Sequence, residues 1–276
     1  MLRSLNSSVS GMKAFQNKLD VIGNNIANVN TVGYKKSRIM FQDVLSQTVR
    51  GSSSPVAGGS GGTNPVQIGL GVKTAAIDTM HTPGSPMTTN LSSDLYIDGD
   101  GFFVVQNDSN AKYMTRAGNF TLDGAGNLVN PQGYKVLNFE GNPIQIDTDV
   151  YVSYTIDYNG VIKGVTPAGT SDEITTLGTV VVSNPGGLKK VGGSLYELTG
   201  NAQMNNDFTA PLIDDLIDKR EFNHAGQIVS GQLEMSNVDL SEEITEMITA
   251  QRGFQANAKV ITVSDSILEE LVNLKR

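Results

Sequence analysis

The residue types that most often perform catalysis or hold a metal ion are scarce in this chain. It has two histidines, His81 and His224, far apart in the sequence, and it has no cysteine. A histidine-based metal site or a Ser/His/Asp triad needs several such groups close together, and no glycine-rich phosphate-binding motif occurs. We therefore expect no catalytic residue, no metal site and no cofactor, and we predict that the protein is not an enzyme.

The segment Asp98-Gly-Asp-Gly101 comes closest to a ligand motif. Its two aspartates have the spacing of the first ligands of a calcium-binding loop. However, Phe102 stands at the third ligand position and the twelfth position is not acidic. Glycine and aspartate are also common turn residues. We interpret this segment as a turn between two strands.

Hydrophobic residues near both ends of the chain recur every seven positions. This spacing places them on one face of an α-helix and is typical of coiled coils. The first helix is expected from about Ser4 to Asn30. The second is expected from Asp239, which can cap it together with Glu242, to Leu274. We predict that the two helices pair along a seam formed by Leu5, Met12, Phe15, Leu19, Ile22, Ile26, Val29, Leu240, Ile244, Met247, Phe254, Ile261 and Leu268.

The middle of the chain has a different pattern. From Leu95 on, short runs of β-branched and aromatic residues alternate with turn signals, which predicts a mainly antiparallel β domain. The expected fold class is therefore α+β. The predicted domains are an N-terminal helical part of an inner core (1–45), a Gly/Ser-rich linker and extended arm (46–90), a central β domain (91–235) and a C-terminal helix of the inner core (236–276).

The sequence leaves three segments open. Residues 34–48 can continue as a second short helix or as an extended arm. Residues 51–64 are rich in glycine and serine and can be a linker, a mobile loop or an ordinary surface loop. Residues 211–222 fit a helical face or an irregular excursion from the β domain.

Several polar or small residues occur inside the predicted helices. Asparagine is a poor helix former, and glycine in a helix costs about 1 kcal/mol relative to alanine. One interpretation is a frayed end of the first helix. The other is a second surface that contacts a neighbouring chain once the seam is used internally. The candidates for such contacts between subunits are Asn24, Asn25, Asn28, Gln251, Arg252, Gly253 and Asn257.

The seam is short compared with the length of chain that it must order. Burying about twelve apolar side chains does not offset the conformational entropy lost by about 60 ordered residues. We therefore predict that both ends of a free subunit are largely disordered and fold on assembly.

Charge and hydropathy exclude two classes of partner. The net charge is −8, whereas a nucleic-acid-binding surface needs clustered lysine and arginine. No run of about 18 apolar residues occurs, so no membrane insertion is expected. The N-terminal residues also lack the apolar block of a secretory signal peptide, so no such signal is expected.

Long motifs in three parts of the chain resemble one protein family. The segment Leu19–Lys35 resembles the N-terminal motif of the bacterial flagellar rod and hook proteins. Their C-terminal motif is similar to Ser236–Leu240, Met247–Asn257 and Leu271–Leu274. The start of their β domain is similar to 98–105 and 115–120.

The resemblance implies a structural, axial protein of the bacterial flagellum. Such subunits pass through the type III export apparatus and polymerise with copies of themselves into a helical tube outside the cytoplasmic membrane. The terminal helices would line the tube and the β domain would form its outer wall. The expected neighbours are other axial proteins: the rod, the hook cap and the hook–filament junction.

Within this family the resemblance favours the hook, the universal joint that transmits motor torque to the filament. The end of the chain and the motif that begins at Ser236 look like those of the short hook proteins of Gram-positive bacilli. The alternative is the distal rod, a stiff drive shaft, which the chain length also suits. A cell-surface adhesin with a coiled-coil stalk would instead form an oligomer of fixed size.

Overall fold

The computed structural model describes residues 2–55, 61–202, 213, 217 and 225–274. The chain divides into two compact units. Unit 1 comprises Met1–Ala27, Ser37–Asp78 and Asp239–Arg276, and unit 2 comprises Asn28–Lys36 and Thr79–Val238. Residues 37–78, which the sequence analysis divided between the N-terminal helical part and the linker and arm, therefore fold with the terminal helices.

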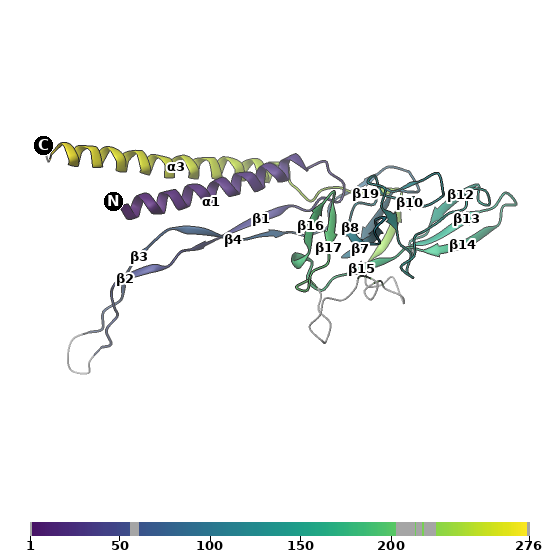
Figure 1. Ribbon diagram of the computed structural model, residues 1–276, viewed down its shortest axis with the longest axis horizontal. Coiled ribbons are helices and arrows are strands. Elements are labelled where there is room, and N and C mark those ends of the chain that lie inside the picture. The colour runs from purple at the N-terminus through teal and green to yellow at the C-terminus, as the bar shows by residue number, and fades with distance from the viewer. Residues whose placement is uncertain (1, 56–60, 203–212, 214–216, 218–224, 275–276) are drawn as a thin grey trace. The chain divides into compact units, whose positions relative to one another are not determined.

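Two long helices lie side by side in unit 1 (Figure 1). Helix α1 spans Leu2–Ala27 and helix α3 spans Leu240–Asn273, and they run antiparallel. The Asp239 side chain accepts hydrogen bonds from the backbone N–H groups of Ser241 (2.8 Å) and Glu242 (3.3 Å), which satisfies two donors at the start of α3. The α+β class and the pairing of the terminal helices are thus confirmed.

The rest of unit 1 is extended. Strand β1 (Ser37–Asp43) pairs with β4 (Val72–Thr79), and β2 (Ser46–Arg50) pairs antiparallel with β3 (Val66–Gly69). Of the two alternatives for residues 34–48, the second helix is therefore wrong. In β3 the β-branched Val66 and Ile68 alternate with Gln67 and Gly69, which favours a strand because successive side chains point to opposite faces.

Unit 2 consists of short, mostly antiparallel strands. Its largest sheet has eight strands in the order β16-β17-β8-β7-β11-β10-β9, with β15 also pairing with β7. These strands are β7 (Gly101–Gln106), β8 (Lys112–Thr115), β9 (Thr121–Leu122), β10 (Leu128–Val129), β11 (Lys135–Val136), β15 (Thr179–Val181), β16 (Lys189–Gly192) and β17 (Leu195–Glu197). A short 3₁₀ helix, Pro185–Gly187, precedes β16.

Three smaller sheets complete unit 2. Strands β12 (Ser153–Ile156), β13 (Val161–Val165) and β14 (Ser171–Thr176) form an antiparallel meander. Strand β6 (Leu95–Asp98) pairs with β18 (Gln227–Ser230), and β5 (Pro86–Thr88) pairs with β19 (Gln232–Glu234). The C-terminal strands of the unit thus return to its first strands, which closes unit 2 by pairing residues far apart in the sequence.

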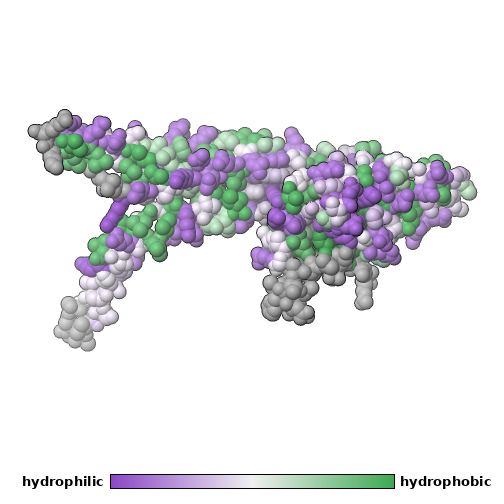
Figure 2. Space-filling model, viewed as in Figure 1, coloured by the Kyte–Doolittle hydropathy of each residue, from purple (hydrophilic) through white to green (hydrophobic). Residues whose placement is uncertain are grey.

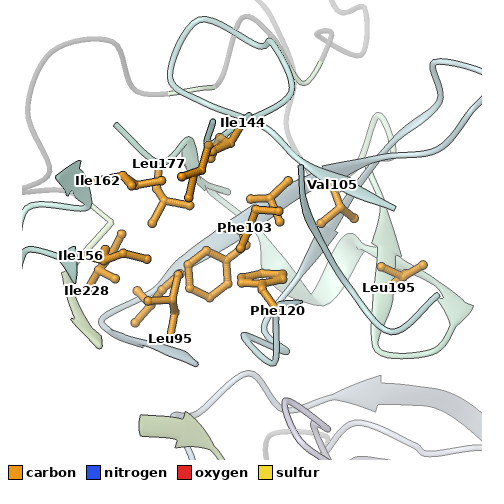
Figure 3. Packing of buried hydrophobic residues seen from close by; sticks show 14 residues of the cluster. Leu95, Phe103, Val105, Phe120, Ile144, Ile156, Ile162, Leu177, Leu195 and Ile228 are labelled. Carbon is orange, nitrogen blue, oxygen red and sulfur yellow. The ribbon is translucent and has the colours of Figure 1, made fainter. Parts of the chain in front are cut away.

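The hydrophobic core of unit 2 is arranged around β7. Phe103 and Val105 point into one buried cluster, where the Phe103 ring packs edge-on against Phe120 at 5.2 Å (Figure 3). Phe102 and Val104 belong to a second cluster. Since side chains alternate along a strand, β7 is covered on both faces, which explains why the sequence from Phe102 to Val105 is continuously apolar.

Two predicted segments, 98–101 and 211–222, differ in how much of them the structure describes. Asp98 ends β6 and Gly101 begins β7, so the calcium-like motif is a turn between strands, as predicted. Within 211–222, residues 213 and 217 are described and the others lie outside the described residues, as does His224. No helix in the described part of the chain is long and apolar enough to span a membrane.

Candidate functional site: the helix pair and the Glu234 cluster

Close contacts fix the register of α1 against α3. A Cβ atom added to Gly253 would lie 2.6 Å from the Phe15 ring, and one added to Gly11 would lie 3.0 Å from the Asn257 amide. Gly11 thus lies opposite Asn257 and Phe15 opposite Gly253, as expected for antiparallel helices. Lys18 also forms an ion pair with Glu246. Gly253 therefore admits the Phe15 ring of the same chain.

Asn25 joins α1 to two other elements of unit 1. Its side-chain amide donates to Glu243 Oε2 (3.1 Å) and to the backbone oxygen of Ser37 (2.9 Å), and its Oδ1 accepts from the Ser37 N–H (3.0 Å). Asn25 and Glu243 are both buried. A buried polar pair is tolerated when its groups are hydrogen-bonded. Asn25 thus connects α1, α3 and the start of β1.

Helix α1 also packs on the strands of unit 1. The Phe15 and Phe41 rings meet edge-on at 6.2 Å, and the Asn17 amide donates to Thr74 Oγ1 at 3.3 Å. The backbone N–H of Val72 donates to Ser10 Oγ at 3.3 Å. Helix α1 therefore contacts both α3 and the strands of unit 1, whereas most described side chains of α3 other than those facing α1 are exposed.

The observed seam differs from the predicted one on α3. Its most buried positions are Glu243, Ala250 and Ser264, with Asn257 half-buried in the same seven-residue series. The predicted Met247, Phe254, Ile261 and Leu268 are half-buried beside this series. Leu240 and Ile244 are 45% and 44% exposed, so their assignment to the seam is wrong. The helices approach each other over small and polar residues, which places the larger side chains at the margin.

On α1 one of the predicted seam residues is buried and five are half-buried. Ile22 is buried, and the half-buried residues are Leu5, Met12, Phe15, Leu19 and Ile26. Val29 lies beyond the end of α1 in unit 2, so it does not belong to the seam.

The helix ends early because Asn28, Val29 and Asn30 form a turn that leads to Gly33, whose φ is 66°. A Cβ there would lie 2.5 Å from Ala117 N, so only glycine fits.

The candidates for contacts between subunits separate into two groups. Asn25, Gly253 and Asn257 are used inside the chain, and Asn28 accepts a hydrogen bond from the Thr31 hydroxyl (3.1 Å) within unit 2. Asn24, Gln251 and Arg252 have exposed side chains. A position off the apolar stripe predicts an outward-facing side chain, and for Asn25 and Asn257 this prediction is wrong. The signal missed was the in-phase polar series Glu243, Asn257 and Ser264 on α3.

Unit 2 contains a buried cluster of charges, the Glu234 cluster, formed by Lys35, Arg116 and Glu234. Lys35 Nζ lies 2.7 Å from Glu234 Oε1, and Arg116 Nη1 lies 3.6 Å from Oε2. All three residues are at most 2% exposed. Lys35 also donates to the Thr82 oxygen (2.8 Å) and Arg116 to the Gly99 oxygen (2.6 Å). Buried charges persist when paired and hydrogen-bonded in this way.

The cluster has two cations for one anion. Burial lowers the pKa of Lys35, and the Glu234 carboxylate opposes this effect. Burial likewise lowers the pKa of Arg116, again opposed by Glu234. Glu234 is therefore the group on which both cations depend for compensation. Lys35 and Glu234 are 199 residues apart in the sequence, so no local pattern could have predicted the cluster.

Glu234 and Asn237 also hold together segments of unit 2 that lead to unit 1. Glu234 accepts at Oε1 from the Gly84 N–H (2.9 Å), and its backbone oxygen accepts from Gly33 (2.8 Å). Asn237 accepts from the Lys36 N–H (2.7 Å) and donates to the Met80 oxygen (2.9 Å). The chain continues into unit 1 after Lys36, before Thr79 and after Val238. Three of the connections of unit 2 are thus fixed at one place.

His81 lies beside this cluster, among aromatic rings. Its ring packs 5.4 Å from Tyr196 and 5.7 Å from Phe102. Burial, with the charges of Lys35, Arg116 and Lys190, lowers the pKa of His81 to about 4. The ring is therefore neutral at pH 7 and serves as an aromatic packing group. No cluster of His, Asp and Glu that could hold a metal occurs among the described residues.

Comparison with known proteins identifies the family. Three family profiles match: "Flagella basal body rod protein" over residues 5–35, "Flagellar hook protein FlgE/F/G D1 domain" over 96–164 and "Flagellar basal body rod FlgEFG protein C-terminal" over 229–274. They contain, in turn, most of α1 with the turn to Lys35, the centre of unit 2, and α3.

Full-length relatives agree with the profiles. The flagellar basal-body rod protein FlgG of Bacillus subtilis is 50% identical over 277 residues, covering 100% of both chains. FlgG of Borreliella burgdorferi is 36% identical over 282 residues, and the flagellar hook protein FlgE of the same organism is 28% identical over 453 residues, each with 100% of both chains covered. These relatives are structural components and not enzymes. The chain therefore belongs to the family of bacterial flagellar rod and hook proteins and is a structural protein of the flagellum.

Proposed function

We propose that this chain is a subunit of the distal rod of the flagellar basal body, where copies of it polymerise into a stiff helical tube. The observation that carries the proposal is the 50% identity to a rod protein over the full length of both chains. Two further rod relatives align over 273 and 282 residues, close to the 276 residues of this chain.

The hook is the second candidate. The motif that begins at Ser236 and the end of the chain resemble those of short hook proteins. The hook relatives align over 453 and 475 residues at 28% and 26% identity, so they contain long segments that this chain lacks. A subunit without those segments is closer in size to the rod relatives, which supports the rod over the hook.

Imaging basal bodies from cells that lack the gene tests this choice. A rod subunit predicts truncated rods without hooks, and reintroducing the gene restores full rods. Complete rods that lack only hooks would contradict the rod and support the hook. Normal rods and hooks would contradict both assignments.

The proposed polymer assigns a role to the helix pair. The most buried side chains of α3 are small or polar, and most of its other described side chains are exposed within unit 1. We expect neighbouring subunits to cover that surface, with the exposed Asn24, Gln251 and Arg252 among the contacts. A helix pair that gains stability on assembly also suits export of an unfolded chain through the type III apparatus. The hook cap and the hook–filament junction remain expected neighbours.

A further inference from the structure

Unit 2 contains a cavity beside its hydrophobic core. Its volume is about 360 Å³, which is in the range of small-molecule sites in proteins. Residues from four segments line it: 28–34, 115–119, 130–132 and the β16–β17 hairpin at 190–196. All four segments belong to unit 2, whose visible face mixes hydrophilic and hydrophobic residues (Figure 2). The cavity is therefore formed within one compact unit.

Asn130 brings a hydrogen-bond donor to this cavity. Its side chain is 7% exposed, and its Oδ1 accepts from the backbone N–H groups of Gln132 (3.1 Å) and Tyr134 (2.8 Å). Two backbone donors at one amide atom identify that atom as the oxygen. Among the described residues, the Nδ2 group of Asn130 has no hydrogen-bond partner. Since Oδ1 faces the backbone of its own turn, Nδ2 is the part of the amide left for the cavity.

Two other turns of unit 2 have the same hydrogen-bond pattern and show what Asn130 leaves unused. Asp123 Oδ1 accepts from the N–H groups two and four residues further on, at 2.9 and 2.8 Å, so a carboxylate suffices to hold such a turn. Asn138 Oδ1 accepts in the same way at 2.9 Å, and its Nδ2 donates to Thr175 Oγ1 at 3.3 Å. The amide nitrogen of Asn138 is thus used within the chain, whereas that of Asn130 is available to a ligand.

The rest of the lining combines neutral polar groups with small apolar ones. The side-chain amides of Asn119 and Gln132 make no hydrogen bond to the described part of the chain, and the Gln132 amide lies against Gly193. Lys190 is the one cation among the described lining residues, and its Nζ donates to the backbone oxygen of Lys35 at 2.9 Å. The apolar side chains are those of Val32, Ala117, Pro131 and Leu195. Such a lining suits a neutral ligand whose polar and apolar groups lie side by side.

We propose that this cavity binds a sugar with an acetamido group, of the N-acetylhexosamine class. The acetamido carbonyl accepts from Asn130 Nδ2, its N–H donates to the amide oxygen of Asn119 or Gln132, and its methyl group contacts the apolar lining. The ring hydroxyls both donate and accept hydrogen bonds, as side-chain amides do. The inference goes beyond the proposed function and does not depend on it.

A peptide also carries amide groups, but the lining favours a sugar. Peptides that add to a sheet bind through the backbone groups of one strand edge. The polar groups of this cavity are instead side chains that come from separate segments of the chain, such as Asn119 and Asn130. Several side-chain amides around one small cavity suit a compact ligand with many hydroxyl groups.

Titration of the free, full-length subunit, followed by NMR, tests the proposal. The probe is N,N′-diacetylchitobiose, and the matched control is cellobiose, which has hydroxyl groups in place of the acetamido groups. The first sugar should shift backbone signals of 117–119, 130–132 and 192–195. Cellobiose should bind roughly tenfold more weakly or less, because the hydrogen bonds of the acetamido group are lost.

Three outcomes of the titration would overturn the proposal. They are an absence of shifts with diacetylchitobiose, equal binding of the two sugars, and tighter binding of an acetylated dialanine amide, which would indicate a peptide site. Each of them leaves the proposed function standing, since the rod assignment is tested separately by imaging basal bodies.

Asn130→Asp separates the donor from the turn. The substitution keeps an oxygen for the N–H groups of Gln132 and Tyr134, as Asp123 does in its own turn, but it replaces the Nδ2 donor with an acceptor. Binding of diacetylchitobiose should weaken roughly tenfold or more. Asn138→Asp is the matched control, because it makes the same change in a turn outside the cavity lining, and it should leave binding unchanged. Equal effects of the two substitutions would overturn the role of Asn130.

Asn119→Ala keeps the test decisive if Asn130→Asp lowers the stability of unit 2. Asn119 is half-buried in the lining and takes no part in the 130–134 turn. The variant should weaken sugar binding severalfold while its urea denaturation curve stays unchanged. Native affinity in both Asn119→Ala and Asn130→Asp would overturn the proposal.

Discussion

Unit 2 and the helix pair of unit 1 are stabilised in different ways. Unit 2 has two large hydrophobic clusters on either side of β7, and its buried Lys35 and Arg116 pair with Glu234. Among the described side chains of α1 and α3, the buried apolar residues are Ala14, Ile22 and Ala250. Burial of apolar area is the main favourable term in folding. We therefore expect unit 2 to fold within one chain, and the helix pair to depend on its neighbours.

Removing the central anion of unit 2 should have the largest effect. Glu234→Ala removes the main compensating charge of the buried Lys35 and Arg116, which should cost about 3–5 kcal/mol of unfolding free energy. Urea denaturation followed by tyrosine fluorescence measures this cost. The control is Glu197→Ala, which removes the exposed ion pair with Lys189 and should cost at most about 1 kcal/mol. Equal effects of the two substitutions would contradict the role given to the Glu234 cluster.

The pH dependence of unit 2 should come next. Because the pKa of His81 falls to about 4 on folding, the unfolded chain binds the proton first. Stability is then full above about pH 6.5 and is lost as the pH falls from there towards 4, by on the order of 2 kcal/mol. His81→Phe keeps an aromatic ring beside Tyr196 and removes this contribution. Denaturation at pH 7 and pH 4.5 should show a flatter dependence in the variant, and an unchanged dependence would refute the assignment.

The polar contact within unit 1 should have a smaller effect. Asn25→Ala removes three hydrogen bonds and leaves Glu243 and the Ser37 backbone without that partner, at a cost of about 1–2 kcal/mol. Amide hydrogen exchange in α1, α3 and β1 of assembled material measures the loss. Asn24→Ala, one position away and exposed, should change exchange far less. If Asn24→Ala is the more disruptive, Asn25 is not the internal connector.

The smallest expected effect is the difference in stability between alanine substitutions at two glycines of the helix pair. Gly23→Ala meets no atom within 4 Å and should stabilise α1 by about 1 kcal/mol through helix propensity. Gly253→Ala has the same propensity gain, but its Cβ would lie 2.6 Å from the Phe15 ring, so this gain should be lost. Circular dichroism of assembled material compares the two. A stabilised Gly253→Ala variant would show that the helices do not approach closely at this point.

Local patterns in the sequence predicted the helices well and their faces less well. The seven-residue repeats and the Asp239 cap located both helices, because periodicity and capping depend on neighbouring residues. The seam on α3 could not be predicted from apolar residues alone, since its central series is Glu243, Ala250, Asn257 and Ser264 and their partners lie on α1. Tertiary partners thus decided which polar residues are buried.

The strands and the Glu234 cluster illustrate the same limit. The turn signals after Leu95 indicated an antiparallel β domain, and the turn at Asp98–Gly101 was predicted correctly. The strand pairs β5–β19 and β6–β18 join segments at opposite ends of unit 2, so no local signal specifies them. Lys35 belongs to a motif that the sequence shows, but no periodic pattern predicts that it pairs with Glu234, which is 199 residues away.

Hydrogen exchange measured on the free subunit and on assembled material distinguishes a helix pair that depends on its neighbours from one that is stable alone. We predict that amides of β7 and β11 are strongly protected in both states. Amides of α1 and α3 should exchange rapidly in the free subunit and become protected on assembly. Helices as well protected as β7 in the dilute, free subunit would contradict the claim that the helix pair depends on its neighbours.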